Sequence, residues 1–373
     1  MRRPLEGLLV VSLEQAVAAP YCSSRLADAG ARVIKIERAE GDFARGYDRS
    51  IGELSSYFVW LNRGKQSLVA DIKAEADAAL LHRILAQADV FIQNLAPGAA
   101  ERAGFGAVAL RRVNPRLITM DISGYGDTPA YRTMKAYDLL VQAESGLASI
   151  TGHPAGPGRV GVSIVDVGCG MFAHAAILEA LIERGITGEG KQLSTSLFAA
   201  TADWMTVPLL YTEATGAPPP RLGLAHPSLS PYGAFALADG SLVLISIQNE
   251  REWAQFCTIF MNEPDLPTRP GFESNVARVR NRPAVDALIA ADFAKLDRET
   301  ARAKLLASNT AFGFVNDVAA LASHPALRRT TVETEFGAAR IACPPVSVYG
   351  EDVSLGRVPA IGEHTDQIRS EFS

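Results

Sequence analysis

Cysteine is scarce in this sequence, and the cysteines that occur do not form motifs. Cys22, Cys169, Cys257 and Cys343 lie far apart, and no two of them make a CxxC pair. This spacing excludes the common zinc-binding patterns and does not suggest a disulfide framework. We therefore expect reduced thiols in a cytoplasmic protein and no metal site.

Basic charge is not in excess either. The 373 residues include 36 Lys and Arg against 41 Asp and Glu, which gives a net charge of −5. An acidic chain without a basic patch argues against nucleic acid and against a membrane surface as partners. The apolar stretch GLLVVSL (7–13), which Glu14 ends, is too short for a signal-peptide core or a bilayer span. We interpret it as a buried strand.

Several catalytic motifs are absent as well. The sequence has no GxSxG, HExxH or P-loop pattern, and its six histidines are too dispersed for a metal site. The first elements follow the outline of a dinucleotide-binding fold up to Glu37, but the turn LEQAVAAPY (13–21) contains no glycine. Glycines in that turn let the backbone approach a pyrophosphate. NAD binding is therefore disfavoured, and Glu37 is interpreted as the solvated end of a strand.

What the sequence does contain is a regular alternation of strand and helix patterns. The predicted strands cover 7–13, 31–37, 90–95 and 116–126, and the predicted helices between them cover 20–29, 74–89 and 97–105. This alternation is typical of an α/β fold in which helices cover a parallel sheet. Hydrophobic residues make up 48% of the chain, enough for a large core.

The pattern changes in the second half. A helix is predicted over 168–184, and the Pro- and Gly-rich stretch 211–223 has the composition of a linker. The segment 231–247 then resembles a β-hairpin. We predict a large domain over 1–200, a linker over 201–224, a small domain over 225–325 and a C-terminal return to the large domain over 326–373.

Asp166 is an isolated charge in the apolar and small-residue stretch GVSIVDVGCG (161–170). A buried carboxylate is costly unless it is paired or kept for chemistry. Because a helix is predicted after it, Asp166 should lie near the helix N-cap, where backbone N–H groups and the helix dipole favour the ionised form. A structural cap and a catalytic group both fit this pattern, and a position beside the strand ends of a parallel sheet favours catalysis.

Eight stretches together resemble the class III CoA-transferase family (CaiB/BaiF type), which includes formyl-CoA transferase and the α-methylacyl-CoA racemases. They occur in the family's order and cover nearly the whole chain. They are PLEGLLVVSLEQAVAAPYCSSRLADAGARVIKIE, LNRGKQSLVADIK, DVFIQNLAPGAAERAGFG, NPRLITMDISGYG, KAYDLLVQAESGLASITG, VDVGCGM, PYGAFALADG and GEHTDQI. The resemblance implies a Rossmann-like large domain, a smaller inserted α+β domain and an interlocked homodimer.

The resemblance also assigns roles to residues. It implies that Asp166 is a nucleophile that takes up CoA through a mixed anhydride and an aspartyl-CoA thioester, which is covalent catalysis. CoA is then a substrate, and no tightly bound cofactor is expected. The family's CoA contacts carry over to Val17, Ala18, Arg38, Ala70, Asp71, Ile72, Lys73, Asn94, Leu95, Ala96, Arg102, Lys135, Ala136, Tyr137 and Asp138.

Three functions remain open at this point. Racemases of the family carry His-Asp where this chain has Tyr137-Asp138, and tyrosine is a poor base near neutral pH, which favours transfer. The stretches AHPSLSPYGAF and QNEREW most resemble transferases of branched C5 dicarboxylic acids of the mesaconate, citramalate or itaconate type. The alternatives are an α-methylacyl-CoA racemase or isomerase and a non-catalytic CoA-binding protein. The glycine-rich flap of the oxalate-type members is absent after the predicted hairpin, where the chain has SIQNEREW.

Overall fold

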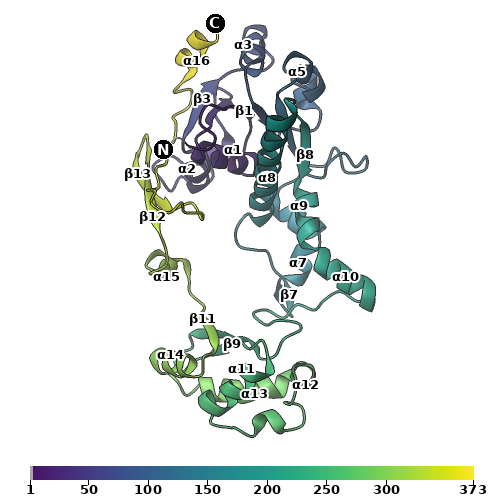
Figure 1. Ribbon diagram of the computed structural model, residues 1–373, viewed down its shortest axis with the longest axis vertical. Coiled ribbons are helices and arrows are strands. Elements are labelled where there is room, and N and C mark those ends of the chain that lie inside the picture. Colours follow the sequence, from purple (N-terminus) through teal and green to yellow (C-terminus); the bar gives the residue numbers. More distant parts are fainter. Residues whose placement is uncertain (1–2) are drawn as a thin grey trace. The chain divides into compact units, whose positions relative to one another are not determined.

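The structure, a computed structural model, describes residues 3–373, which form two compact units (Figure 1). The larger unit contains the residues up to 148 together with 159–209 and 328–373. The smaller unit contains 149–158 and 210–327. The stretch predicted as a linker, 201–224, is mostly helical as far as Thr215, because all of its prolines and glycines except Pro208 follow that residue.

A six-stranded parallel sheet forms the centre of the larger unit, which confirms the predicted α/β fold. Its strand order is β3-β2-β1-β4-β5-β8. The order runs outward in both directions from β1 and β4, so the reversal point lies between these two strands. The strands are β1 (Leu9–Leu13), β2 (Arg32–Glu37), β3 (Lys65–Val69), β4 (Val90–Gln93), β5 (Ile118–Ser123) and β8 (Gln192–Ser196).

The two faces of this sheet are buried under different helices. Along β1, Val10 packs on one side with α1 (Ala18–Asp28) and α8 (Ile164–Thr187), whereas Val11 packs on the other side with α3 (Glu75–Leu85). Successive strand side chains point to opposite faces, so a sheet covered on both sides needs continuous apolar runs such as LVVSL. The remaining helices before residue 151 are α2 (Ser56–Asn62), α4 (Ala99–Arg102), α5 (Ala107–Val113), α6 (Asp138–Glu144) and α7 (Leu147–Ile150).

Helix α8 explains the small-residue stretch around Asp166. It packs so closely on α1 that a Cβ on Gly170 would lie 2.5 Å from the carbonyl oxygen of Ala18, and a Cβ on Gly168 would overlap the ring of Trp204. Within residues 3–373, α8 is the one helix that is long and apolar enough to span a membrane. Its side chains Val165, Cys169, Ala173 and Ile177, spaced by four, lie in the core of the larger unit. Its apolar character therefore fits a core helix.

The C-terminal residues lie against the first part of the chain. α16 (Thr365–Glu371) packs beside β3 in Figure 1, and the backbone N–H of His364 donates to the carbonyl of Ser67 at 3.0 Å. The hairpin of β12 (Arg329–Thr334) and β13 (Gly337–Ala342) also belongs to the larger unit. The polar edge strand β3 is thus covered by the end of the chain.

The smaller unit has its own core around an antiparallel sheet in the order β11-β10-β9. Phe235, Val243 and Trp253 belong to this core. The elements not yet named, here and in the connecting segments, are β6 (Gly152–His153), β7 (Gly156–Pro157), α9 (Leu197–Trp204), α10 (Thr206–Thr215), β9 (Tyr232–Ala236), β10 (Leu242–Ser246), α11 (Glu250–Gln255), α12 (Asn275–Arg280), α13 (Arg282–Phe293), α14 (Arg298–Ala307), β11 (Ala311–Phe314) and α15 (Val318–Ala322). The hairpin predicted over 231–247 is β9 and β10, paired from Tyr232 to Ser246.

Candidate active site

A cavity of about 580 Å³ opens in the larger unit at the carboxyl ends of the central strands. Gln15 to Ala18 follow β1, Asn94 to Pro97 follow β4, and Ser123 to Gly126 end and follow β5, and all three segments line it. β1 and β4 are the two strands at which the strand order reverses. This is the position at which open parallel sheets bind their ligands.

The cavity contains most of the residues predicted for the site. Those that line it are Val17, Ala18, Asn94, Leu95, Ala96, Lys135, Ala136, Tyr137, Asp138 and Asp166. The other predicted residues follow strands at the same edge of the sheet but lie outside the cavity wall: they are Arg38 after β2, Ala70, Asp71, Ile72 and Lys73 after β3, and Arg102 in α4 after β4. The predicted set therefore follows one edge of the sheet.

Asp166 lies inside the first turn of α8, near the helix N-cap as the sequence predicts, but it is not the capping residue itself. The helix begins at Ile164, two residues earlier, and ends at Thr187 before Gly188. The N-cap position belongs to Ser163, whose side chain makes no capping hydrogen bond. The sequence predicts the helix start at the small residues after Asp166, but the β-branched Ile164 and Val165 already form its first turn.

Asp138 caps α8 from a neighbouring helix. Its Oδ1 accepts the backbone N–H groups of Val165 at 2.8 Å and of Asp166 at 3.2 Å. Its Oδ2 accepts from the side-chain amide of Gln142 at 2.7 Å, and the Oε1 of Gln142 accepts from the backbone of Val160 at 2.9 Å. Asp138 is buried. Its Oδ1 holds the first turn of α8, and its Oδ2 holds the loop before α8 through Gln142.

The pKa of Asp166 is raised to about 7, firstly because the carboxyl is removed from water and secondly because the negative charge of Asp138 lies nearby. No cation within residues 3–373 forms an ion pair with Asp166 to offset these effects. The helix terminus was expected to favour the ionised form of this carboxyl, but burial and the charge of Asp138 outweigh that effect. A poorly solvated carboxylate without a cation is a better nucleophile than one in water.

Aromatic side chains form part of the wall near Asp166. Phe43, Tyr47 and Tyr57 line the cavity, and the hydroxyl of Tyr57 is hydrogen-bonded to that of Ser163 at 2.9 Å. The pKa of Tyr47 is raised to about 12 by burial and by the carboxylates of Asp42 and Asp166. Tyr47 therefore keeps its proton at neutral pH and adds no charge to the site.

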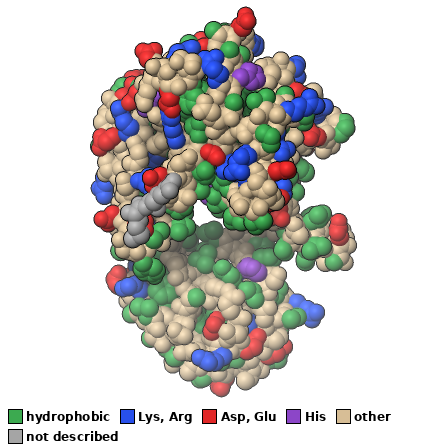
Figure 2. Space-filling model, turned by 45° about the horizontal axis from the view of Figure 1, so that its top comes forward, with side chains coloured by type: hydrophobic (Ala, Val, Ile, Leu, Met, Phe, Trp, Pro, Cys, Tyr) green, Lys and Arg blue, Asp and Glu red, His purple; other side chains and the backbone are tan. Residues whose placement is uncertain are grey.

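Three cations line the same cavity, and none of them has an acidic partner among the described residues. They are Arg132, Lys135 and Arg159. Arg159 is anchored by its own loop, because its Nε donates to Val160 at 3.1 Å and its Nη2 donates to Gly161 at 3.2 Å. Cations without an acidic protein partner can bind anionic ligands. Over the visible face of the molecule, by contrast, acidic and basic side chains are interspersed (Figure 2).

Several segments of the wall are not among the predicted site residues, including residues 131–134 with Arg132. Residues 43–57 supply the aromatic side chains, and the turn Ser123 to Gly126 after β5 supplies backbone. The glycines of the SGYG turn were visible in the sequence as a strand end, but nothing in the aromatic residues marks them as part of a cavity. Arg159 also lacked a sequence signal, because a single arginine in a loop is usually a surface residue. Within residues 3–373, no cluster of His, Cys, Asp and Glu could hold a metal ion.

Comparison with known proteins decides the family. The model of CoA-transferase family III matches residues 5–365, nearly the whole chain. The chain belongs to CoA-transferase family III. It is therefore an enzyme that transfers CoA between an acyl-CoA thioester and a carboxylic acid.

Individual relatives are similar to this chain along nearly the whole of both sequences. The acetyl-CoA:oxalate CoA-transferase of Acetobacter aceti is 34% identical over 99% of this chain and 96% of the relative. The succinyl-CoA:mesaconate CoA-transferase of Haloarcula hispanica is 30% identical over 98% of this chain and 96% of the relative. The crystal structure of a CaiB/BaiF family protein from Brucella suis superposes with a TM-score of 0.86 at 31% identity, covering 100% of both chains.

Proposed function

We propose that this family III enzyme transfers CoA through Asp166 and that its acid substrate is a branched C5 dicarboxylic acid. The observation that carries the proposal is a poorly solvated carboxylate that lines a cavity and forms no ion pair with any cation of residues 3–373. A carboxylate is a suitable nucleophile for this exchange because it can replace either of the two acids in turn.

The proposed reaction balances without a redox partner. The Asp166 carboxylate attacks the donor thioester, the carbon–sulfur bond breaks, and a mixed anhydride and CoA thiolate form. The thiolate then attacks the aspartyl carbonyl, which releases the donor acid as a carboxylate and leaves an aspartyl-CoA thioester. The acceptor carboxylate reverses both steps and restores free Asp166.

We propose that CoA lies along the strand ends with its thioester in the cavity. Val17, Ala18, Asn94, Leu95, Ala96 and residues 135–138 would contact the part nearest the thioester. The cations Arg38, Lys73 and Arg102 follow β2, β3 and β4 at the same sheet edge, and their exposed side chains suit the phosphates of CoA. The side-chain amide of Asn94 is already used, because it donates to and accepts from the backbone of Gln15.

The dicarboxylic acid proposal rests on Arg159 and on the relatives. Oxalate and mesaconate, the acids named for the two relatives, both carry two carboxylates. One carboxylate of the acid must react, so the other needs a partner in the cavity. Arg159 lines the cavity with Asp166, and a guanidinium binds a carboxylate through two parallel hydrogen bonds. We assign the second carboxylate to Arg159.

The racemase alternative is disfavoured by the way Asp138 is used. A base that removes an α-proton must have a free lone pair near the substrate. The carboxylate of Asp138 instead accepts three hydrogen bonds, two on Oδ1 from the first turn of α8 and one on Oδ2 from Gln142, so most of its acceptor capacity is used to hold the protein. Tyr137, which stands where the racemases carry histidine, is 60% exposed.

We also propose that the chain works as a homodimer, as the family resemblance implies. The larger unit leaves large apolar side chains exposed on its helices, among them Ile182 at 69%, Ile186 at 84% and Val207 at 75%. A second subunit would cover them. Light scattering should then give twice the 39.8 kDa of one chain, and a folded monomer of 39.8 kDa would contradict the proposal.

The proposed function is tested by a transfer assay with Asp166→Asn. With succinyl-CoA or acetyl-CoA as donor, the wild type should form a new thioester with mesaconate, citramalate or itaconate in preference to shorter acids. Asp166→Asn should lose several orders of magnitude of turnover while it still binds the donor, because an amide cannot form the anhydride. Asp121→Asn is the matched control, since Asp121 is a half-buried carboxyl on β5 that does not line the cavity. An Asp166→Asn enzyme with normal turnover, or wild-type exchange of α-protons with heavy water without transfer, would contradict the proposal.

A further inference from the structure

The turn after β1 carries a residue in an unfavourable conformation. Ala16 has a φ of 65°, in the left-handed region that residues with a Cβ rarely adopt. The turn from Gln15 to Ala18 lines the cavity. A strained residue persists only where its surroundings hold it in place, and such residues gather at functional sites.

Two side chains hold this turn. The Oδ1 of Asp42 accepts the backbone N–H of Ala16 at 3.3 Å and that of Ala44 at 3.0 Å. Asn94 holds the neighbouring residue, because its Oδ1 accepts from the N–H of Gln15 at 2.9 Å and its Nδ2 donates to the carbonyl of Gln15 at 2.8 Å. Asp42 is therefore the side chain that fixes the strained amide itself.

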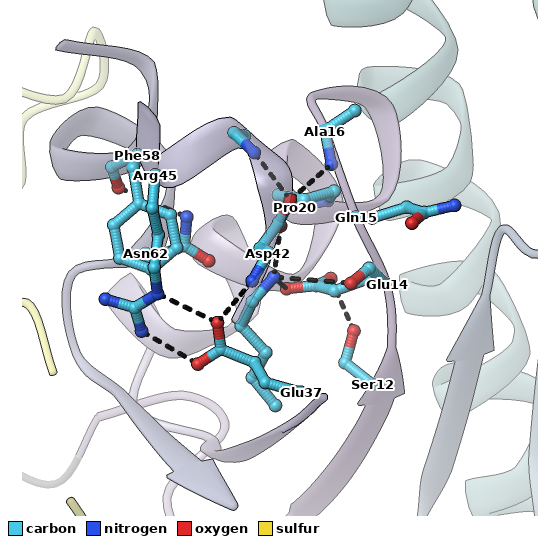
Figure 3. A network of polar contacts seen from close by, with 12 residues as sticks. Ser12, Glu14, Gln15, Ala16, Pro20, Glu37, Asp42, Arg45, Phe58 and Asn62 are labelled. Carbon is cyan, nitrogen blue, oxygen red and sulfur yellow. Dashed lines mark hydrogen bonds and ion pairs between the residues drawn. The ribbon is translucent and has the colours of Figure 1, made fainter. Parts of the chain in front are cut away.

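Asp42 is in turn held by a buried lysine. The Nζ of Lys35 donates to the Oδ2 of Asp42 at 2.8 Å, and neither side chain is exposed to solvent. Lys35 also lies 3.5 Å from a carboxylate oxygen of Glu14, which is paired with Lys65 at 2.6 Å. Figure 3 shows the side chains of Glu14 and Asp42 close together beside the turn at Ala16. The ion pair Lys35–Asp42 thus connects the turn at Ala16 to the buried charges of Glu14 and Lys65.

The charges in this network balance, and each has several partners. Three carboxylates (Glu14, Glu37 and Asp42) meet three cations (Lys35, Arg45 and Lys65). Glu37 accepts two bonds from Arg45, one from the hydroxyl of Ser67 and one from the backbone of Asp42. Well-packed apolar residues often stabilise a fold as much as buried ion pairs do. A set of six buried charges beside a strained turn therefore calls for a reason other than stability.

The turn that Asp42 holds is in contact with the helix that carries Asp166. A Cβ on Gly170, one turn beyond Asp166, would lie 2.5 Å from the carbonyl oxygen of Ala18, so α8 packs directly on the end of this turn. Movement of the turn would change both the wall that holds the thioester and the packing beneath the nucleophile. Small displacements of reacting groups are costly, since misplacement by about 1 Å can lower a rate by about 100-fold.

We propose that Asp42, fixed by Lys35, is a positioning residue that holds the amide of Ala16 and with it the Gln15–Ala18 wall against which Asp166 attacks the thioester. This inference rests on the proposed transferase function for its kinetic consequence. Asp42 acts through the backbone of Ala16 and does not itself contact the substrate.

The test uses two charge-neutral double variants that differ only at residue 42. Lys35→Met with Asp42→Asn removes the ion pair but keeps an oxygen that accepts from Ala16. Lys35→Met with Asp42→Leu removes the ion pair and the acceptor. Hydrogen exchange of the peptide over 14–19, followed by mass spectrometry, should show faster exchange in the Leu variant than in the Asn variant. The kcat with succinyl-CoA as donor should fall ~100-fold in the Leu variant and only a few-fold in the Asn variant.

A third change separates positioning from general damage. Ala16→Gly allows the left-handed conformation without strain, so it should recover part of the kcat lost in the Leu variant. If the Asn and Leu variants exchange and react alike, or if Ala16→Gly adds to the loss, the inference is wrong. If the wild type shows no transfer with any acid, the proposed function fails, while the exchange comparison still tests whether Asp42 holds Ala16.

Discussion

One oxygen of Asp138 accepts the backbone N–H of Asp166 at 3.2 Å, so one acidic residue holds another in the first turn of α8. The same oxygen accepts from Val165 at 2.8 Å. Asp138 therefore fixes the backbone of the proposed nucleophile and at the same time raises the pKa of its side chain. Geometry and reactivity at Asp166 are coupled through this one carboxylate.

The first prediction is a pH profile set by Asp166. Its pKa is raised to about 7, and only the ionised carboxylate can attack a thioester. The kcat/KM for the donor should thus fall about tenfold per pH unit below about pH 7 and level off above it. A steady-state profile with saturating acceptor measures this. A plateau that extends down to about pH 5 would show that the nucleophile has an ordinary carboxyl pKa.

Asp138→Asn should move this profile. The variant removes the negative charge beside Asp166 but keeps an oxygen that can cap α8. The pKa of Asp166 should then fall, and the acid limb of kcat/KM should move to lower pH by up to about one unit. Burial, the larger cause of the raised pKa, remains. An unchanged acid limb in a folded Asp138→Asn enzyme would mean that Asp138 acts on the backbone alone.

Asp166→Asn should stabilise the fold at alkaline pH. The raised pKa means that native Asp166 retains its proton between about pH 4 and pH 7, where the unfolded chain has lost it. Wild-type stability therefore falls as the pH rises through this range, whereas the Asn variant has no proton to lose. The gain should be near zero at about pH 4 and on the order of 1–3 kcal/mol at about pH 8. Denaturant unfolding of both proteins at the two pH values checks the sign, and a variant that is less stable at about pH 8 contradicts the account.

Arg159→Ala should impair recognition of dicarboxylic acids selectively. Loss of a charge-assisted pair should raise the KM for mesaconate by about 10–100-fold, which corresponds to about 1.5–3 kcal/mol. A monocarboxylic acid of the same carbon skeleton should be affected much less, because it has no second carboxylate to lose. Arg159→Lys keeps the charge and should recover part of the difference. An equal rise in KM for both acids would mean that Arg159 binds CoA or only holds the loop around Gly161.

The parallel sheet was predictable because most of its strands are apolar on both faces. The exceptions are β8, QLSTS, and β3, KQSLV, and β3 has no local pattern that marks it as a strand. Lys65 is buried because it pairs with Glu14, and Ser67 is buried because it donates to Glu37. These partners lie far away in the sequence, so no local pattern indicates that a lysine belongs inside.

Glu37 was missed for the same reason. A glutamate at the end of a strand is usually solvated, but here it is 4% exposed and is paired with Arg45. The position of Asp166 on α8 was predicted to within one turn, whereas its cap could not be predicted. Asp138 reaches the helix from 28 residues earlier in the chain, and only the folded structure brings the two together. The cations of the cavity were partly predicted from the family resemblance, and Arg159 was not.

The most direct test of the account is to trap the covalent intermediate. The enzyme is incubated with succinyl-CoA, treated with hydroxylamine or borohydride, digested with trypsin and analysed by mass spectrometry. The account predicts a modified Asp166 in the peptide between Arg159 and Arg184, formed only when donor is present and absent in Asp166→Asn. A modified residue elsewhere in the chain, or transfer that proceeds at full rate with no modification of Asp166, would contradict it.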